Sequence, residues 1–111
     1  ARELLESHPE LTAVLCTTDS MALGVLAYAE SVGLSVPDDL SVTGFDGIRT
    51  ALDRNLTTVL QPNKAKGAAA GRMLFSFIDD YLADAVPPSP APRTILDTSF
   101  HEGGTVAPPR A

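Results

Sequence analysis

Three polar residues that could bind a small polar molecule follow apolar runs of this sequence. Thr18 comes after TAVLCT, Asp46 comes after SVTGF, and Gln61 comes after LTTVL. A carboxylate at the end of a buried strand costs free energy unless something binds to it. In open parallel sheets, ligands bind beyond the carboxyl ends of the strands, and hydroxyl, carboxylate and amide groups can pair with hydroxyls or ring nitrogens. Because none of the three residues is an evident nucleophile, the pattern favours holding a small molecule over transforming it.

A second interpretation is that the acidic residues only cap helices and turns. Asp19 and Ser20 precede the apolar segment MALGVLAYAESV, where either side chain can accept a hydrogen bond from the first free backbone amides of a helix. We expect Asp19 to be such a cap. For Asp46 the residue pattern alone leaves both interpretations open.

Catalytic and metal sites have weak support. The sequence has no G-x-S-x-G nucleophile elbow, and Cys16 lies in an apolar run, as a small core residue does. A dyad of Cys16 with His8 or His101 is therefore disfavoured, and both histidines are expected on the surface. Two histidines and one cysteine share no metal-ligand spacing. We predict no cofactor, no metal and no enzymatic activity, with a hydrolase or transferase that uses Cys16 as a disfavoured alternative.

Two further motifs are interpreted as structural. The acidic pair Asp38-Asp39 is predicted to lie in a turn, and the pair Asp79-Asp80 on a solvated helix face. The stretch TGFDG lacks the pattern G-x-G-x-x-G, so a nucleotide-binding fingerprint is not supported.

The elements that would position these residues alternate between helix and strand. Helices are predicted over 2–7, 21–32 and 64–83, and strands over 12–17, 40–45, 56–61 and 93–100. Between them we predict an irregular or one-turn helical stretch at 46–55, a Pro-rich connector at 86–92, and a turn and tail at 101–111. Strand, helix and strand within about 35 residues form a βαβ unit with parallel strands. The predicted fold class is α/β, part of a doubly wound parallel sheet.

Three of these elements indicate what should surround them in the folded protein. The run 12–17 shows no alternation, which indicates a strand buried on both faces. Apolar residues surround much of the helix at 21–32, so we expect it to be covered on two sides. The helix at 2–7 begins without a capping residue, and we expect further chain upstream of it.

Composition excludes several classes of partner. The chain has 111 residues and a net charge of −6, with 14 acidic against 8 basic residues. Such a surface repels phosphate backbones, so this chain alone should not bind nucleic acid. No apolar run approaches the ~20 residues of a membrane helix, and no signal peptide is visible. A single cysteine fits a reducing compartment, and we predict a cytoplasmic location without membrane contact.

Several spaced motifs resemble the effector-binding core of LacI/GalR-family transcription regulators. They are TDSMALG, GLSVPDDLSVTGFDG, LTTVLQP and the later glycine of GAAAGRML, over about residues 11–75, with a looser match at TILDTSFHEGGTVAPP. The resemblance implies a periplasmic-binding-protein-like type I fold, in which two α/β lobes enclose a small effector, usually a sugar or a purine. It implies that residues 1–111 are a C-terminal lobe fragment. A helix-turn-helix that reads operator DNA and the N-terminal lobe would then lie outside this chain.

The resemblance also assigns roles to residues. Asp46 matches the family's acceptor for effector hydroxyls or a ring N–H, and Gln61 matches the glutamine that borders the cleft. Thr18 stands where many members have an asparagine that contacts the effector. Asn63 stands where some members have a stacking aromatic residue, so that contact is not expected.

The family dimerises through the helix after TD and the segment after GFD. The implied interface residues are Leu23, Leu26, Ala27, Thr50, Leu52, Asp53 and Arg54, although Leu26 also suits ordinary core packing. The implied function is a ligand-responsive transcription regulator, a repressor, acting as a homodimer. The alternative is a periplasmic sugar-binding receptor of the same fold, which an upstream signal peptide would reveal.

Overall fold

The computed structural model describes residues 1–83, 86, 88 and 90–109 and divides into two compact units. The first unit joins Ala1–Gln61 to Ser99–Ala111, and the second is Pro62–Thr98. The first unit contains α1 (Arg2–Ser7), β1 (Ala13–Leu15), α2 (Asp19–Ser31), β2 (Ser41–Asp46), α3 (Arg49–Asp53), β3 (Thr57–Leu60) and β4 (Ser99–His101). The second contains α4 (Asn63–Leu82). The predicted helices and the first three strands are present, with shifts of one or two residues at their ends.

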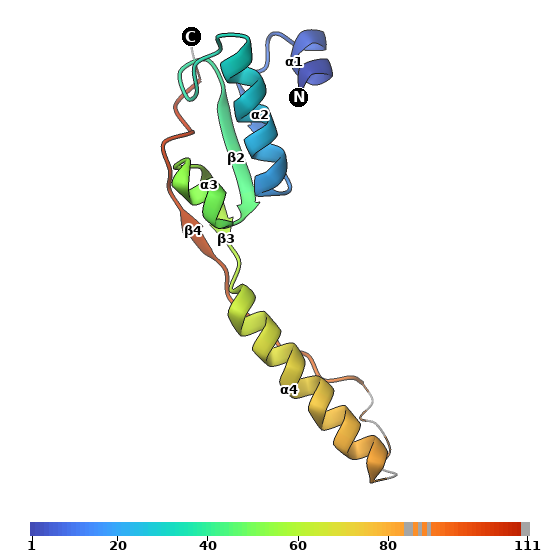
Figure 1. Ribbon diagram of the computed structural model, residues 1–111. Coiled ribbons are helices and arrows are strands. Elements are labelled where there is room, and N and C mark those ends of the chain that lie inside the picture. The colour runs from blue at the N-terminus through green and yellow to red at the C-terminus, as the bar shows by residue number, and fades with distance from the viewer. Residues whose placement is uncertain (84–85, 87, 89, 110–111) are drawn as a thin grey trace. The chain divides into compact units, whose positions relative to one another are not determined.

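The four strands form one sheet in the order β1-β2-β3-β4 (Figure 1). β1 is parallel to β2, and β2 is parallel to β3 with Phe45 beside Val59. β4 is antiparallel to β3, with Leu60 beside Ser99. The prediction of a parallel sheet is therefore wrong for the last strand. β4 pairs with the edge of β3 that β2 leaves open, and it runs in the opposite direction to β3.

The predicted strand at 93–100 is also too long. Only Ser99–His101 pairs with β3, and residues 91–98 carry neither helix nor strand. The predicted connector at 86–92 includes residues 87 and 89, which lie outside the described residues.

Helix α2 lies against β2 and covers one face of the sheet (Figure 1). Gly33, at φ +75°, follows the C-cap residue Val32 in the left-handed conformation that ends helices. The side chains buried between the helices and the sheet are Leu5, Cys16, Ala22, Val25, Leu26, Leu40, Val42, Ala51 and Leu56. The core of this unit is therefore aliphatic and centred on β2.

Strand β1 is not buried on both faces. Val14 packs against the core, whereas Ala13 is exposed and Leu15 is 80% exposed. The apolar run misled the prediction because β1 lies at the edge of the sheet, where nothing in the described part of the chain covers the face that carries Ala13 and Leu15.

The segment after β4 is fixed to the sheet. Thr105 is buried; its hydroxyl donates to the Val42 carbonyl at 2.7 Å and accepts from the Thr57 amide at 2.9 Å. Ser41 and Ala107 exchange two further hydrogen bonds at 3.1 Å. The predicted turn and tail is thus anchored as far as residue 107.

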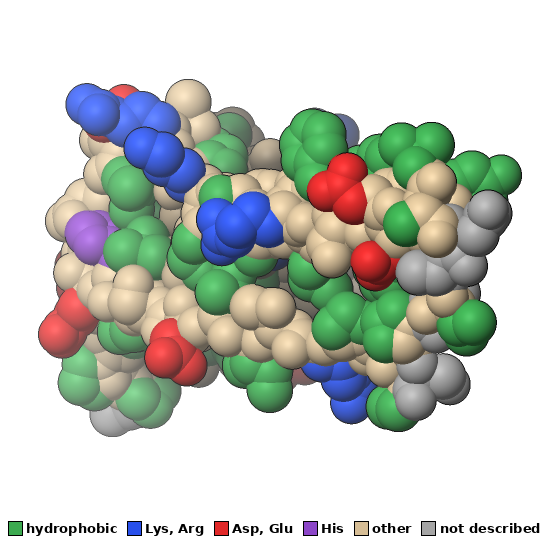
Figure 2. Space-filling view, turned by 90° about the horizontal axis from the view of Figure 1, so that it is seen from below, with side chains coloured by type: hydrophobic (Ala, Val, Ile, Leu, Met, Phe, Trp, Pro, Cys, Tyr) green, Lys and Arg blue, Asp and Glu red, His purple; other side chains and the backbone are tan. Residues whose placement is uncertain are grey.

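In the second unit, α4 is amphipathic. Along one row of residues at spacing four, Ala69 is buried, Met73 and Phe77 are half-buried, and Tyr81 is exposed. The helix also exposes Leu74, Phe75, Ile78 and Leu82. Hydrophobic side chains reach the surface at many points of the face shown in Figure 2.

In the described part of the chain, no helix combines the length and the apolar character that crossing a bilayer requires.

Candidate functional site

The candidate site lies where the three parallel strands end. β1 ends at Leu15, β2 at Asp46 and β3 at Leu60, and parallel strands place their carboxyl ends at one edge of the sheet. Of the three residues predicted to bind a ligand there, the structure joins two directly. Gln61 Nε2 donates to Asp46 Oδ1 at 2.6 Å, and the Gln61 amide donates to the Asp46 carbonyl at 3.2 Å.

Asp46 is half-buried and presents a carboxylate with one oxygen used by Gln61. Its Oδ2 has no hydrogen-bond partner among the described residues. A half-buried carboxylate with an available oxygen is a strong acceptor for a hydroxyl or ring N–H. The pair therefore combines a negatively charged acceptor with an amide, a combination suited to polar, uncharged ligands.

The backbone at Asp46 is strained. Its φ is +129°, a region that residues with a Cβ rarely adopt, and Gly47 follows at φ +73°. Such conformations persist where the surrounding structure enforces them, and they concentrate at functional sites. The turn after β2 therefore places the carboxylate at an energetic cost that glycine would avoid.

We expect Asp46→Gly to be more stable than Asp46→Ala by about 1 kcal/mol. Both variants lose the hydrogen bond from Gln61, but only glycine relieves the backbone strain, which costs about 1–3 kcal/mol. The greater conformational freedom of glycine in the unfolded chain offsets about 0.5–1 kcal/mol of this gain. Urea unfolding of the two variants measures the difference. Equal stabilities would show that the turn is not strained at this residue.

Thr18 is the N-cap of α2. Its backbone is extended (φ −143°, ψ 154°), and its Oγ1 accepts a hydrogen bond from the Met21 amide at 3.2 Å. The hydroxyl proton remains available to a ligand, because the capping bond uses only a lone pair. The predicted contact of Thr18 with an effector stays a prediction.

Asp19 is not the cap that the sequence suggested. It is fully buried; its Oδ1 accepts from Thr58 Oγ1 at 2.5 Å and its Oδ2 accepts from the Ile48 amide at 2.8 Å. The prediction failed because Thr18, one residue earlier, has the extended backbone that a cap requires. Asp19 instead begins the helix and turns its side chain toward β3 and the segment after β2.

The disfavoured catalytic residues lie apart from this edge or in the core. Cys16 is buried, and burial raises the pKa of its thiol, which lowers its nucleophilicity at neutral pH. His8 is exposed and contacts Glu10 at 3.2 Å. His101 was expected on the surface, but it is half-buried with Nε2 enclosed, because β4 places it beside Thr58 in the sheet.

Among the described residues no group of three or more acidic, histidine or cysteine side chains could hold a metal ion. In the predicted turn, Asp39 has a structural role, since its Oδ2 accepts from the Ser35 amide at 2.9 Å, and Asp38 is exposed.

The chain matches the model of the periplasmic binding protein-like domain over residues 1–106. The chain belongs to this family. The helix-turn-helix-type transcriptional regulator IpsA of Corynebacterium glutamicum is 57% identical over 108 residues, which are 97% of this chain and 28% of that protein.

Solved structures of regulators share the fold of this periplasmic binding protein-like domain. A LacI-family transcriptional regulator from Corynebacterium glutamicum superposes with a TM-score of 0.81 at 57% identity, over 96% of this chain and 29% of that one. A LacI-family regulator from Arthrobacter sp. FB24, in complex with lactose, gives a TM-score of 0.76 at 30% identity, over 95% of this chain and 39% of that one. The predicted resemblance to LacI-family regulators is confirmed, and the chain spans less than a third of the length of its Corynebacterium relative.

The predicted interface residues of the domain fall into two groups. Leu26 is only 5% exposed and belongs to the core, so it offers a second copy almost no surface. Leu26 therefore packs in the core, which was the alternative interpretation of this residue, and we do not include it in the proposed interface. The other residues are exposed or half-buried on α2 and around α3: Leu23, Ala27, Thr50, Leu52, Asp53 and Arg54.

Two ion pairs lie at this surface, one between α2 and the residue after α3 and one within α3. Arg54, just after α3, pairs with Glu30 on α2. Arg49 pairs with Asp53 at 2.8 Å along α3. These side chains are largely exposed, so the pairs add little stability in a single chain.

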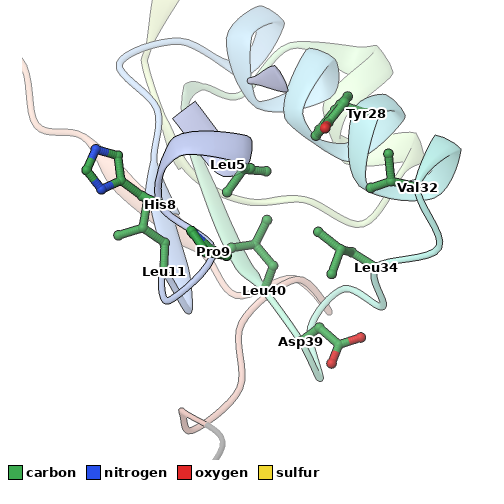
Figure 3. A pocket seen from close by; sticks show the side chains of 9 residues that line it. All are labelled: Leu5, His8, Pro9, Leu11, Tyr28, Val32, Leu34, Asp39 and Leu40. Atoms are coloured by element: carbon green, nitrogen blue, oxygen red, sulfur yellow. The ribbon is translucent and has the colours of Figure 1, made fainter. Parts of the chain in front are cut away.

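A separate hollow of about 230 Å³ lies near the amino ends of β1 and β2 (Figure 3). The residues that line it include Leu5, Tyr28, Leu34 and Leu40. The ring of His8 and the carboxylate of Asp39 are directed away from the hollow. The hollow contains none of the three predicted ligand-binding residues, so it is distinct from the candidate site.

Proposed function

We propose that this chain is the C-terminal part of the effector-binding domain of a LacI-family transcription repressor, with Asp46 and Gln61 as effector contacts. The observation that supports it most directly is the hydrogen-bonded pair of these residues at the carboxyl edge of the sheet. Thr18, at the end of the neighbouring strand, is the third proposed contact. The relatives are transcriptional regulators, not enzymes.

The proposed ligand is a small polar effector of the sugar or purine class. Asp46 accepts hydrogen bonds from hydroxyls or a ring N–H, and the neighbouring Gln61 side chain carries an amide, a group with donor and acceptor atoms. Sugars fit this donor and acceptor set, and the Arthrobacter relative was solved with lactose. An N-terminal lobe outside this chain would supply the opposite side of the cleft.

DNA reading is proposed for a helix-turn-helix outside these residues. With a net charge of −6, the present chain repels the DNA backbone. An effector bound between the two lobes shifts the equilibrium between the operator-binding and operator-free states only because it has a different affinity for each state. The proposed repressor acts in the cytoplasm.

Calorimetry on the intact protein tests this function. We expect heat of binding from at least one of lactose, cellobiose and guanine, and a change in operator affinity in the presence of the compound that binds. If none of a wider panel of sugars and purines binds, the proposed effector role is wrong. A periplasmic receptor would bind sugar without any effect on DNA binding.

We further propose that α2 and α3 contribute to a homodimer. Ala27 is exposed on α2, and α2 contacts α3. Placing a charge at the centre of such an interface costs on the order of 100-fold in dimer affinity. We therefore expect Ala27→Glu to shift the intact protein from dimer toward monomer in analytical ultracentrifugation.

Ser35→Glu serves as the control for this prediction. It adds the same charge at an exposed position in the turn before β2, outside the proposed interface, and it should leave the dimer unchanged. A dimer that persists in Ala27→Glu with wild-type affinity would place the interface elsewhere.

A further inference from the structure

Asp19 is a buried carboxylate that the proposed effector contacts do not include. It has no exposed surface, and its two oxygens accept hydrogen bonds from two different segments of the chain. Thr58 Oγ1 on β3 donates to Oδ1 at 2.5 Å, and the Ile48 amide after β2 donates to Oδ2 at 2.8 Å. An isolated buried charge is strongly unfavourable. Here two hydrogen bonds and the N-terminal end of α2 stabilise it.

The partners of Asp19 lead directly to the proposed effector contacts. Ile48 is two residues after Asp46, at the end of the strained turn. Thr58 is three residues before Gln61 on β3. One carboxylate therefore links the two segments that carry the acceptor and the amide of the site.

The close approach of Asp19 to the sheet depends on Gly44. A Cβ at this position would overlap Asp19 Oδ1 and lie 3.2 Å from the Asp19 Cα. The strand that carries Asp46 thus has no side chain where Asp19 crosses it. The carboxylate lies against the backbone of β2 and reaches both the segment after β2 and the neighbouring strand β3.

Helix capping does not account for this arrangement. Thr18 already accepts the hydrogen bond from the Met21 amide that a cap provides. The Asp19 oxygens are used by side-chain and backbone donors from outside α2. A residue that served only α2 would have no need to contact the turn after β2.

We propose that Asp19 is a positioning residue for the effector site. By accepting from the Ile48 amide it fixes the turn that directs the Asp46 carboxylate, and by accepting from Thr58 it fixes that turn relative to β3, the strand that Gln61 directly follows. The importance of Asp19 for ligand binding rests on the proposed function, whereas its effect on the turn is independent of that function.

Asp19→Asn and Asp19→Ala form a matched pair for testing this role in the intact protein. Asparagine can keep both bonds, with its carbonyl accepting from the Ile48 amide and its Nδ2 donating to a reoriented Thr58 hydroxyl. Alanine loses both. If the alanine variant fails to fold, Asp19→Ser takes its place, since serine suits the first helical turn but is too short to reach both partners.

Two measurements report the turn, and one reports binding. Hydrogen exchange of the Ile48 amide and the three-bond coupling that reports φ of Asp46 follow the turn directly, with the Val42 amide in the core as the internal reference. We expect Ile48 to exchange about tenfold faster or more in Asp19→Ala and near the wild-type rate in Asp19→Asn. Affinity for lactose, cellobiose or guanine should fall by about tenfold in the alanine variant only.

The possible outcomes separate the two proposals. Unchanged Ile48 exchange and an unchanged Asp46 coupling in Asp19→Ala would overturn the positioning role. A turn that loosens while affinity for the bound probe stays at the wild-type value would overturn it as well. If the wild-type protein binds none of the three probes and none of a wider panel of sugars and purines, but the turn still loosens, the proposed effector role of Asp46 fails, and the control of the turn by Asp19 is retained.

Discussion

We expect replacement of Asp46 with alanine to weaken binding of the proposed effector by about 10- to 100-fold. A hydrogen bond to a charged acceptor contributes roughly 1.5–3 kcal/mol, and each 1.4 kcal/mol corresponds to a factor of ten in affinity. The variant also leaves the Gln61 amide without the carboxylate to which it donates at 2.6 Å. Isothermal titration of the intact protein, with the compound that binds the wild type, measures the loss.

Asp38→Ala is the matched control for this experiment. Asp38 is exposed in the turn before β2, at the opposite end of that strand from Asp46. Both substitutions remove one negative charge, so a general electrostatic effect would weaken binding in both. If Asp46→Ala binds the effector as tightly as the wild type does, the assignment of this residue is wrong.

The carboxyl edge of the sheet, where the candidate site lies, could be predicted from the sequence because it depends on local patterns. An apolar run that ends in a polar residue marks the end of a strand, and two parallel strands must end at one edge. Asp46 and Gln61 were predicted to lie there from this reasoning. Their hydrogen bond was not predicted, because it depends on the register between β2 and β3, where Asp46 lies beside Leu60.

The role of Asp19 could not be read from the sequence. Thr18, Asp19 and Ser20 are all good capping residues, and the choice among them depends on which one has an extended backbone. Whether the remaining acidic residue faces water or the core then depends on contacts with Ile48 and Thr58, which are 29 and 39 residues away in sequence. A useful signal would have been Gly44, a glycine inside a strand, which often marks a close approach of another group.

The contacts of the C-terminal segment also could not be predicted from local sequence patterns. Nothing local distinguishes Thr105 from any other threonine near a double glycine, yet it is buried and donates to the Val42 carbonyl at 2.7 Å.

The burial of β1, at one edge of the sheet, was also predicted wrongly. Apolar composition predicts burial for Leu15, but its exposure is decided by the position of β1 at the end of the strand order.

Replacing Gly44 with alanine should lower the free energy of unfolding by about 1–3 kcal/mol, the usual cost of adding a methyl group to a packed core. The new Cβ would overlap Asp19 Oδ1 and lie 2.8 Å from Leu56 Cδ2. Neither neighbour can move freely, since both residues are fully buried and Asp19 is held by two hydrogen bonds. Denaturant unfolding measures the loss.

Gly24→Ala provides the control, because a Cβ at this position in α2 meets no other atom within 4 Å. Alanine there should stabilise the helix by about 0.5–1 kcal/mol. The two glycine-to-alanine changes are therefore expected to have opposite signs. Gly44→Ala should also speed exchange of the Ile48 amide, because it displaces the carboxylate that accepts from it. A variant that loses stability while Ile48 exchange stays at the wild-type rate would show that the packing at Gly44 is independent of the turn that carries Asp46.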